Sequence, residues 1–182
     1  MNLYIIADSL EPVSTKLLGS SQQMGSQFEQ RIIPTHTFKT APPIDVLLVP
    51  GGQGTRAKEI TSSIEYMKLI YPTLQYLITI CTGSGLAARA GLLNGKQATT
   101  NKLSYKATIA LGPDVNWVSH ARWVVDENIW TSSGVSAGID VTFAWMAEVY
   151  GSEVAEGIAN RMEYTRVTES TSDEFAVLYD LI

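Results

Sequence analysis

Tyr76-Leu77-Ile78-Thr79-Ile80-Cys81-Thr82-Gly83-Ser84-Gly85-Leu86-Ala87-Ala88 is the stretch that decides the fold of this chain. The first five residues are apolar or β-branched and predict a buried strand. Small residues after Cys81 then begin a helix that ends at Gly91. A strand, one reactive side chain on a sharp turn and a helix are the pattern of a nucleophile elbow. The turn needs little bulk beside the nucleophile, and Gly83 meets that need on the helix side.

A cysteine at this turn has surroundings that favour the thiolate. The start of the following helix carries partial positive charge and unpaired backbone N–H groups, which favour a negative sulfur. The same N–H groups, chiefly that of Thr82, can hold a developing oxyanion. A lone cysteine after an apolar strand is also typical of a buried core residue. The pattern around Cys81 alone therefore leaves both interpretations open.

The composition fits one compact domain and argues against several classes of partner. The chain has 182 residues, of which 45% are hydrophobic, and we treat 1–182 as one domain with a loosely held tail over 165–182. The net charge is −5, the isoelectric point is near 5.0, and there is no basic run. We therefore expect neither nucleic acid nor a membrane as partner.

Cysteine and histidine usage bears on metals and on the compartment. One cysteine cannot form an internal disulfide, and with two histidines it cannot build a zinc site. We therefore expect no metal and no cofactor. The N-terminal residues Met1–Tyr4 lack the basic and apolar regions of a signal peptide, which predicts a cytoplasmic protein.

Strand and helix patterns alternate along the chain. The expected strands are 3–7, 31–38, 45–49, 76–80, 97–100 and 115–123, with a hairpin that joins 123–125 to 129–130; Ser14–Gln30 is expected to be a long loop. The expected helices are 59–71, 83–91, 104–111, 139–150 and 153–164, the last capped by Ser152. This alternation predicts an α/β domain with a mostly parallel sheet.

The aliphatic strand Asp45–Val49 runs into Pro50-Gly51-Gly52. Gly51 and Gly52 allow the backbone to approach a ligand at the carboxyl end of this strand, which is where open α/β sheets bind ligands. An ordinary tight turn explains the same residues.

Four motifs in order resemble the ThiJ/PfpI superfamily, over about Leu3–Tyr150. They are Asp-Val-Leu-Leu-Val-Pro-Gly-Gly at 45–52, Ile-Cys-Thr-Gly-Ser at 80–84, Ala-Gly-Leu-Leu-Asn-Gly at 90–95 and Thr-Ser-Ser-Gly-Val-Ser-Ala-Gly-Ile-Asp at 131–140. The Cys-Thr-Gly form is most similar to the isonitrile hydratase branch, and it also occurs in the sensor domains of AraC-type regulators.

The resemblance implies a fold and roles for individual residues. The fold is a flavodoxin-like three-layer sandwich of the glutamine-amidotransferase type, with helices on both faces of a mostly parallel sheet and a small β-hairpin. Cys81 matches the reactive cysteine, and the backbone of Gly51, Gly52, Thr82 and Gly83 matches the positions that face the substrate. Ser133, Gly134, Val135, Ser136 and Asn101 match surrounding positions. The resemblance also implies a homodimer that takes a small-molecule substrate or ligand.

Two departures from the family pattern matter. Leu3–Ala7 matches the family's second strand, so the first strand, and the acidic residue after it that contacts the cysteine, are expected to be missing. Glu11 precedes Pro12 in a different context and does not match that acid. Many relatives have histidine where this chain has Asn101, and an asparagine cannot transfer a proton.

Two functions follow as hypotheses. The first is isonitrile hydratase-like chemistry, a lyase reaction in which the Cys81 thiolate attacks a small electrophile and water completes the reaction. The second is a non-catalytic member that senses oxidants or binds a small ligand, and the missing acid does not weaken it. Glyoxalase or deglycase activity fits less well, because it goes with a different residue after the cysteine and with a histidine partner.

Overall fold

A four-stranded sheet forms the centre of the molecule. The computed structural model describes residues 1–15, 29–57 and 60–182. The strand order is β5 (Val46–Val49), β6 (Tyr76–Ile80), β10 (Ile129–Ser132) and β9 (Trp123–Asp126). The first three strands are parallel and β9 is antiparallel to β10. Because β5, β6 and β10 run the same way, their carboxyl ends lie at one edge of the sheet.

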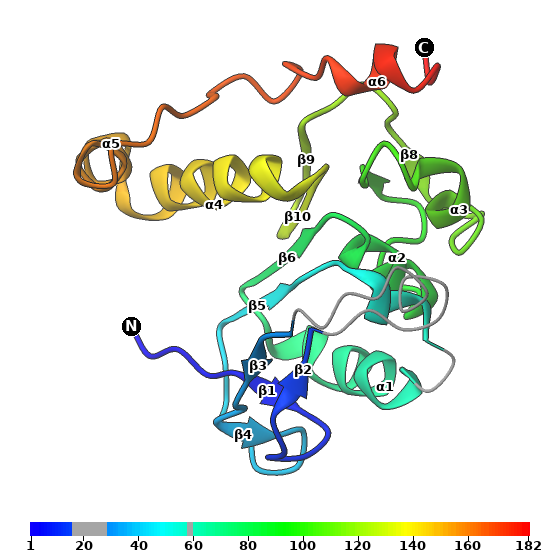
Figure 1. Cartoon of the computed structure of the whole chain (residues 1–182), viewed down its shortest axis with the longest axis vertical. Helices are drawn as coiled ribbons and strands as arrows, with labels where there is room; N and C mark the ends of the chain where they lie inside the picture. The colour runs from blue at the N-terminus through cyan, green and yellow to red at the C-terminus, as the bar shows by residue number, and fades with distance from the viewer. Residues whose placement is uncertain (16–28, 58–59) are drawn as a thin grey trace.

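Helices cover both faces of this sheet (Figure 1). On one face, α1 (Thr61–Ile70) and α2 (Gly83–Arg89) bury a cluster that includes Leu77 and Ile129. On the other face, α4 (Val135–Tyr150) packs its Val141 and Trp145 against Ile78, and α5 (Ser152–Arg161) packs on α4. This arrangement confirms the flavodoxin-like three-layer sandwich with a mostly parallel sheet.

Short elements complete the fold. They are the 3₁₀ turns η2 (Gln53–Arg56) and η3 (Tyr71–Thr73), the helices α3 (Tyr105–Ile109) and α6 (Phe175–Leu178), and the parallel pair β7 (Gln97–Ala98) and β8 (Asn116–Trp117). Strands β9 and β10 form the predicted hairpin. No helix among the described residues is both long enough and apolar enough to cross a bilayer.

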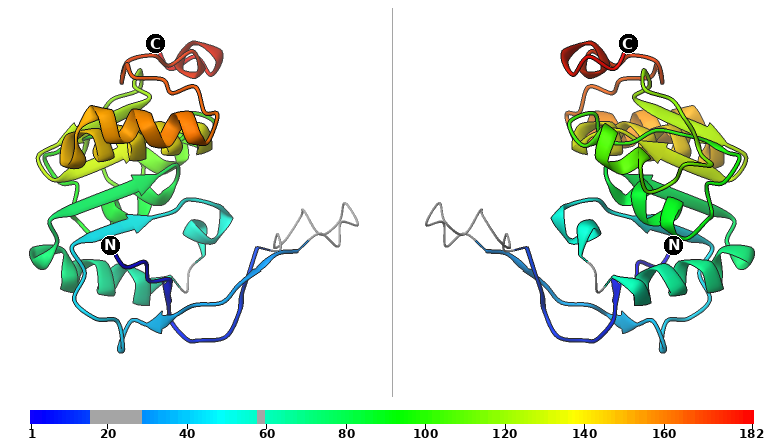
Figure 2. Two further views of the ribbon diagram at one scale, coloured as in Figure 1. Left: turned by 90° about the vertical axis from the view of Figure 1, so that its left-hand side faces the viewer. Right: turned by 90° about the vertical axis from the view of Figure 1, so that its right-hand side faces the viewer.

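The N-terminal part forms two small sheets apart from the central one. Strand β1 (Ile6–Ala7) pairs in parallel with β4 (His36–Thr37), and β2 (Val13–Ser14) pairs antiparallel with β3 (Arg31–Ile32). Figure 2 shows that the β2–β3 ribbon extends away from the rest of the described chain. The expected loop 14–30 lies mostly outside the described residues.

Strand β5 is an edge strand within the described part of the chain, although its sequence is typical of an internal strand. It pairs with β6 alone, and Leu48 is 45% exposed. Among the described residues, one edge of this aliphatic strand is therefore left without a paired strand.

Several element boundaries differ from the sequence predictions. The predicted strand 31–38 is two strands, because Pro34 between them has no N–H for a ladder hydrogen bond. The predicted strand 115–123 pairs only at its two ends: Asn116 and Trp117 of β8 pair with Gln97 and Ala98, and Trp123 begins β9. Helix α4 begins at Val135 rather than 139, because Ala137 and Gly138 pack into the core and Gly138 lies directly against Ile80. Ser152 does not cap α5; the N-cap is Gly151.

Residues 165–182 were expected to be a loose tail, yet in the structure they are anchored. Asp173 and Ala176 are buried, with 5% and 0% of their surface exposed. Arg122 N–H donates to Ser170 O at 2.6 Å, so the segment also contacts the backbone next to β9.

The different burial of Leu77 and Leu48 predicts different losses of stability on mutation to alanine. Leu77 is fully buried at 0% exposure, whereas Leu48 on the neighbouring strand is 45% exposed. Leu77→Ala should lower the free energy of unfolding by about 2–5 kcal/mol, because it leaves a cavity under α2. Leu48→Ala is the control and should cost less than about 1 kcal/mol. Urea titration followed by tryptophan fluorescence measures both, and equal losses would contradict the assignment of this core.

Asp126 predicts a pH dependence. Its Oδ2 accepts a hydrogen bond from Gln97 N–H at 2.8 Å, and this bond, with a smaller contribution from Lys96, lowers the pKa of the Asp126 carboxyl from its ordinary 3.8. The stabilisation is therefore present above pH 3.8 and is lost as pH falls through the lowered value. The difference in unfolding free energy between wild type and Asp126→Asn should shrink on acidification. Urea titrations at several pH values measure it, with Asp114→Asn as an exposed control.

Candidate functional site

Cys81 lies directly after β6 in a strained backbone conformation. Its φ angle is 57°, in the left-handed region, where a residue with a Cβ is uncommon. Three hydrogen bonds hold both of its backbone polar groups. Its N–H donates to Ser132 O at 3.2 Å, and its carbonyl oxygen accepts from Thr100 Oγ1 at 3.0 Å and Ser84 Oγ at 3.1 Å. This is the sharp strand-to-helix turn of a nucleophile elbow, and it leaves Cys81 partly exposed.

The end of β5 lies against this turn. A Cβ placed on Gly51 would be 2.7 Å from both Cys81 Cβ and Thr82 N. Gly83, on the other side of the cysteine, lies as closely against the carbonyl groups of Val49 and Pro50. Only glycine allows these two segments of the backbone to approach so closely. The predicted positions Gly51 and Gly83 therefore lie together with Cys81.

The backbone N–H groups beside Cys81 differ from one another. Within the described residues, the N–H groups of Thr82 and Gly83 have no hydrogen-bond acceptor. The N–H of Gly52, which was predicted to face a substrate, donates instead to Thr82 Oγ1 at 3.0 Å. Thr55 Oγ1 lies 3.0 Å from the same oxygen. Thr82 and Gly83 are therefore the donors that can hold an oxyanion, and Gly52 supports Thr82.

The surrounding residues predicted from the sequence are placed on two loops. Asn101 Oδ1 accepts from Ser104 N–H at 3.0 Å, and Asn101 Nδ2 is 3.6 Å from the position of a Cβ on Gly134. Ser133 is buried, whereas Val135 and Ser136 are exposed at the start of α4. Ser132, which directly precedes this turn, accepts the Cys81 N–H through its carbonyl.

A proton donor for Cys81 is not found in the part of the chain that the structure describes. No side chain there forms a hydrogen bond with Cys81 Sγ. Glu11 is exposed. His120 is also exposed, and His36 contacts Thr35 and the ring of Tyr4. No group of three or more potential metal-binding side chains occurs among these residues either.

Sequence reasoning missed three hydroxyl groups that build the turn. Thr100 and Ser84 donate to the Cys81 carbonyl, and Thr55 lies against Thr82. Ser84 follows from its place in the first turn of α2, but no local pattern points to Thr55 or Thr100.

A concave region lies apart from this site. A groove of about 720 Å³ lies between α4, α5 and residues 164–168, and its lining includes Glu148, Glu156 and Arg166. None of its lining residues belongs to the turn around Cys81.

Comparisons with known proteins agree with this fold. A solved structure of a THiJ/PfpI family protein from Pseudomonas syringae superimposes with a TM-score of 0.75 at 29% identity, over 99% of this chain and 73% of that one. Isonitrile hydratase from Pseudomonas putida is 33% identical over 132 residues, which cover 72% of this chain and 57% of the relative.

A regulator is also among the relatives. The HTH-type transcriptional regulator GbdR from Pseudomonas aeruginosa is 28% identical over 137 residues, which cover 75% of this chain and 37% of the regulator. The matched part thus spans 57% of the hydratase and 37% of the regulator, less than two thirds of either. The sequence pattern of the DJ-1/PfpI family matches residues 9–148, which is most of the chain. On this evidence, this chain belongs to the DJ-1/PfpI family.

Proposed function

We propose that this chain is a cysteine-dependent enzyme that adds water to a small electrophile, with an isonitrile as the concrete substrate. The observation that carries the proposal is the left-handed turn at Cys81, which presents one side chain beside two N–H groups that have no acceptor among the described residues. The similarity to isonitrile hydratase supports the same chemistry.

The reaction has two steps. Cys81 Sγ forms a bond to the terminal isonitrile carbon, and a proton is added to that carbon, which gives a thioimidate. Water then adds across the C=N bond, with its oxygen on the same carbon and one proton on the nitrogen. The C–S bond breaks as the second water proton goes to Cys81 Sγ. The products are an N-substituted formamide and the free thiol. The net reaction therefore converts one isonitrile and one water into one formamide. The N–H groups of Thr82 and Gly83 hold the oxygen that water brings.

The second candidate is a sensor that binds a small ligand or an oxidant at Cys81. Two observations favour it. No carboxyl or imidazole group contacts Cys81 within the described residues, and GbdR, a transcriptional regulator, is a relative. Oxidation of a thiolate by peroxide needs no positioned acid, so this function requires fewer groups than hydration.

Partners and compartment follow as part of the same proposal. We expect a homodimer with a small-molecule substrate or ligand, in the cytoplasm. The acidic charge of −5 remains the argument against nucleic acid as a partner of this chain. The relationship to helix-turn-helix regulators makes that expectation worth a direct binding assay.

Substitution of Cys81 tests the enzymatic function. Wild type should convert a simple alkyl isonitrile to its formamide, and Cys81→Ala and Cys81→Ser should each lower kcat/KM by more than about 100-fold, because the attacking sulfur is gone. His120→Ala, at an exposed position, should leave the rate unchanged. Formamide is measured by chromatography. Turnover that survives Cys81→Ala would refute the first function. Absence of turnover in wild type, with a sulfenic acid formed by peroxide at Cys81, would favour the sensor.

Gly51 offers a test of the geometry. In Gly51→Ala the new methyl group would lie 2.7 Å from Cys81 Cβ, so the turn must shift. We expect the rate of Cys81 alkylation by iodoacetamide to change by at least about tenfold and stability to fall by about 1–3 kcal/mol. Gly54→Ala, in the adjoining turn η2, is the matched control, because no atom of the described residues lies within 4 Å of its Cβ position. Since Cys81 is the only cysteine, mass spectrometry reports its alkylation alone. Equal behaviour of the two variants would mean that the close approach of β5 does not shape the site.

A further inference from the structure

The segment 165–182, here called the C-terminal strap, runs from α5 past α4 and β9 to α6 (Figure 1). Its first anchor is Asp140 in α4, whose side chain is fully buried. Asp140 Oδ1 accepts from Val167 N–H at 3.0 Å and from Tyr164 Oη at 3.1 Å, and Oδ2 accepts from Arg122 Nε at 2.8 Å. The carboxylate therefore joins the strap to α4 and to Arg122.

Arg122 extends this connection to one loop of the candidate site. The backbone N–H of Arg122 donates to Ser170 O of the strap at 2.6 Å, and the backbone carbonyl of Arg122 accepts from Ser133 N–H at 2.9 Å. Its Nη2 also lies 3.4 Å from Ser136 Oγ. The turn 133–136 and the strap therefore share one positioned arginine.

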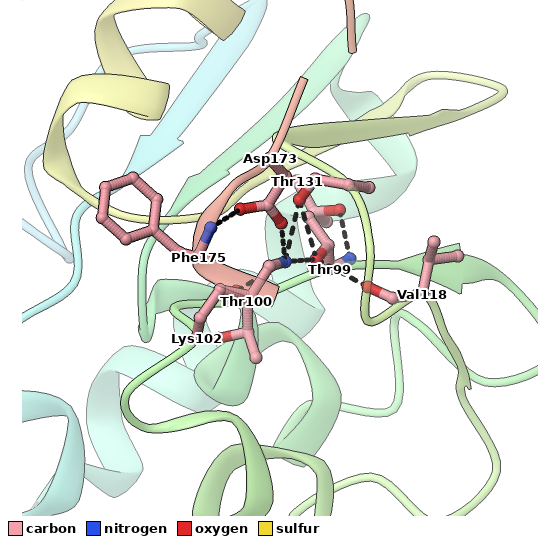
Figure 3. Close-up of polar contacts among 8 residues, drawn as sticks. Thr99, Thr100, Lys102, Val118, Thr131, Asp173 and Phe175 are labelled. Carbon is pink, nitrogen blue, oxygen red and sulfur yellow. Dashed lines mark hydrogen bonds and ion pairs between the residues drawn. The ribbon is translucent and has the colours of Figure 1, made fainter. Parts of the chain in front are cut away.

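A buried ion pair connects the strap to the other loop (Figure 3). Asp173 Oδ2 lies 3.2 Å from Lys102 Nζ, and the two side chains are only 2% and 1% exposed. Lys102 Nζ also donates to Thr99 Oγ1 at 2.7 Å and to Ala121 O at 2.8 Å. On the strap itself, Asp173 Oδ1 accepts from Phe175 N–H at 3.1 Å. The pair thus fixes both the start of α6 and the corner 99–102.

That corner holds the backbone of Cys81. Thr100 Oγ1 donates to the Cys81 carbonyl at 3.0 Å, and Thr99 N–H donates to Thr131 Oγ1 at 2.9 Å. Thr131 precedes Ser132, whose carbonyl accepts the Cys81 N–H. A chain of direct contacts therefore leads from Asp173 through Lys102 and Thr99–Thr100 to the two polar backbone groups of Cys81.

The ion pair is not explained by stability alone. A buried pair contributes little net stability compared with apolar residues of similar size, because both charges lose their hydration. Burial lowers the pKa of Lys102, and the Asp173 carboxylate opposes that shift. Loss of Asp173 would leave the ammonium of Lys102 buried without a counter-charge. The strap and the corner 99–102 would then separate to let water reach it.

We propose that Lys102 and Asp173 are positioning residues for Cys81, through which the seating of the C-terminal strap determines the geometry of the turn. A test by the reactivity of Cys81 rests on the proposed function, whereas a test by hydrogen exchange of the backbone does not. By thermodynamic linkage, a change at Cys81 must also change how firmly the strap is held.

The test compares the 182-residue chain with three variants. Asp173→Asn removes one charge of the pair, and Lys102→Met with Asp173→Leu removes both. The control, Glu127→Gln, removes one of the two carboxylates paired with Lys96, and the Glu127 side chain is 73% exposed. Hydrogen exchange is followed at 79–86, 97–102 and, as a distant reference, 35–38. Protease cleavage within 165–172 reports release of the strap, and iodoacetamide reports the reactivity of Cys81.

We expect Asp173→Asn to release the strap. Hydrogen exchange should become more than about tenfold faster at 79–86 and 97–102, with no change at 35–38. The alkylation rate of Cys81 should change at least about fivefold. The double variant should return all three towards wild type, and Glu127→Gln should match wild type. A released strap with exchange and alkylation within twofold of wild type would overturn the proposal. So would an equal increase of exchange in every segment, or a strap that stays protected.

A measurement on wild type covers the case in which Asp173→Asn does not fold. Alkylation of Cys81 should change cleavage of the strap at least threefold, and unchanged cleavage would overturn the coupling. If Cys81 of wild type does not react at all, the proposed function fails. The exchange data for Asp173→Asn and wild type then still decide the coupling, because an equal increase of exchange at 79–86 and 35–38 refutes it.

Discussion

The structure around the candidate site depends on the fixation of one peptide segment, the backbone of Cys81. A left-handed φ of 57° costs about 1–3 kcal/mol for a residue with a Cβ, so it persists only where neighbours hold it. Here three different elements do so. Strand β10 accepts the N–H, the corner after β7 donates to the carbonyl, and the first turn of α2 donates to it as well. The strain is therefore distributed over contacts that are distant in sequence.

The same constraint accounts for the small residues around the cysteine. Since β5 and β6 are paired in register and end together, the chain leaving β5 must pass beside the turn. Gly51 and Gly83 allow this passage without contact distances shorter than van der Waals radii permit. Gly138 plays the matching part on the other face, where α4 approaches Ile80. Packing and site geometry are thus set by the same three glycines.

Local pattern was enough to predict the parts of the site that lie along one stretch of chain. The strand 76–80, the turn at Cys81, the strand before Pro50 and the hairpin of β9 and β10 all follow from apolar runs and small residues. The role of Gly52 did not, because a sequence does not show that the Thr82 hydroxyl turns back to accept its N–H. Thr100 and the Lys102–Asp173 pair were missed for a related reason. Their partners come from other elements, and an ion pair between such distant residues leaves no periodic signal.

The two candidate functions differ in their need for a proton donor, whereas both need the sulfur of Cys81. Both need Cys81 to be accessible, and the turn provides that. Hydration of an isonitrile also requires a proton at the attacked carbon, and Asn101 cannot supply one, since an amide does not ionise near neutral pH. The described residues near Cys81 offer hydroxyl groups, but those of Thr100 and Ser84 already donate to its carbonyl. If the chain is an enzyme, the proton must therefore come from water or from a group beyond the described residues. An enzyme of this design would depend on that proton source, whereas a sensor would not.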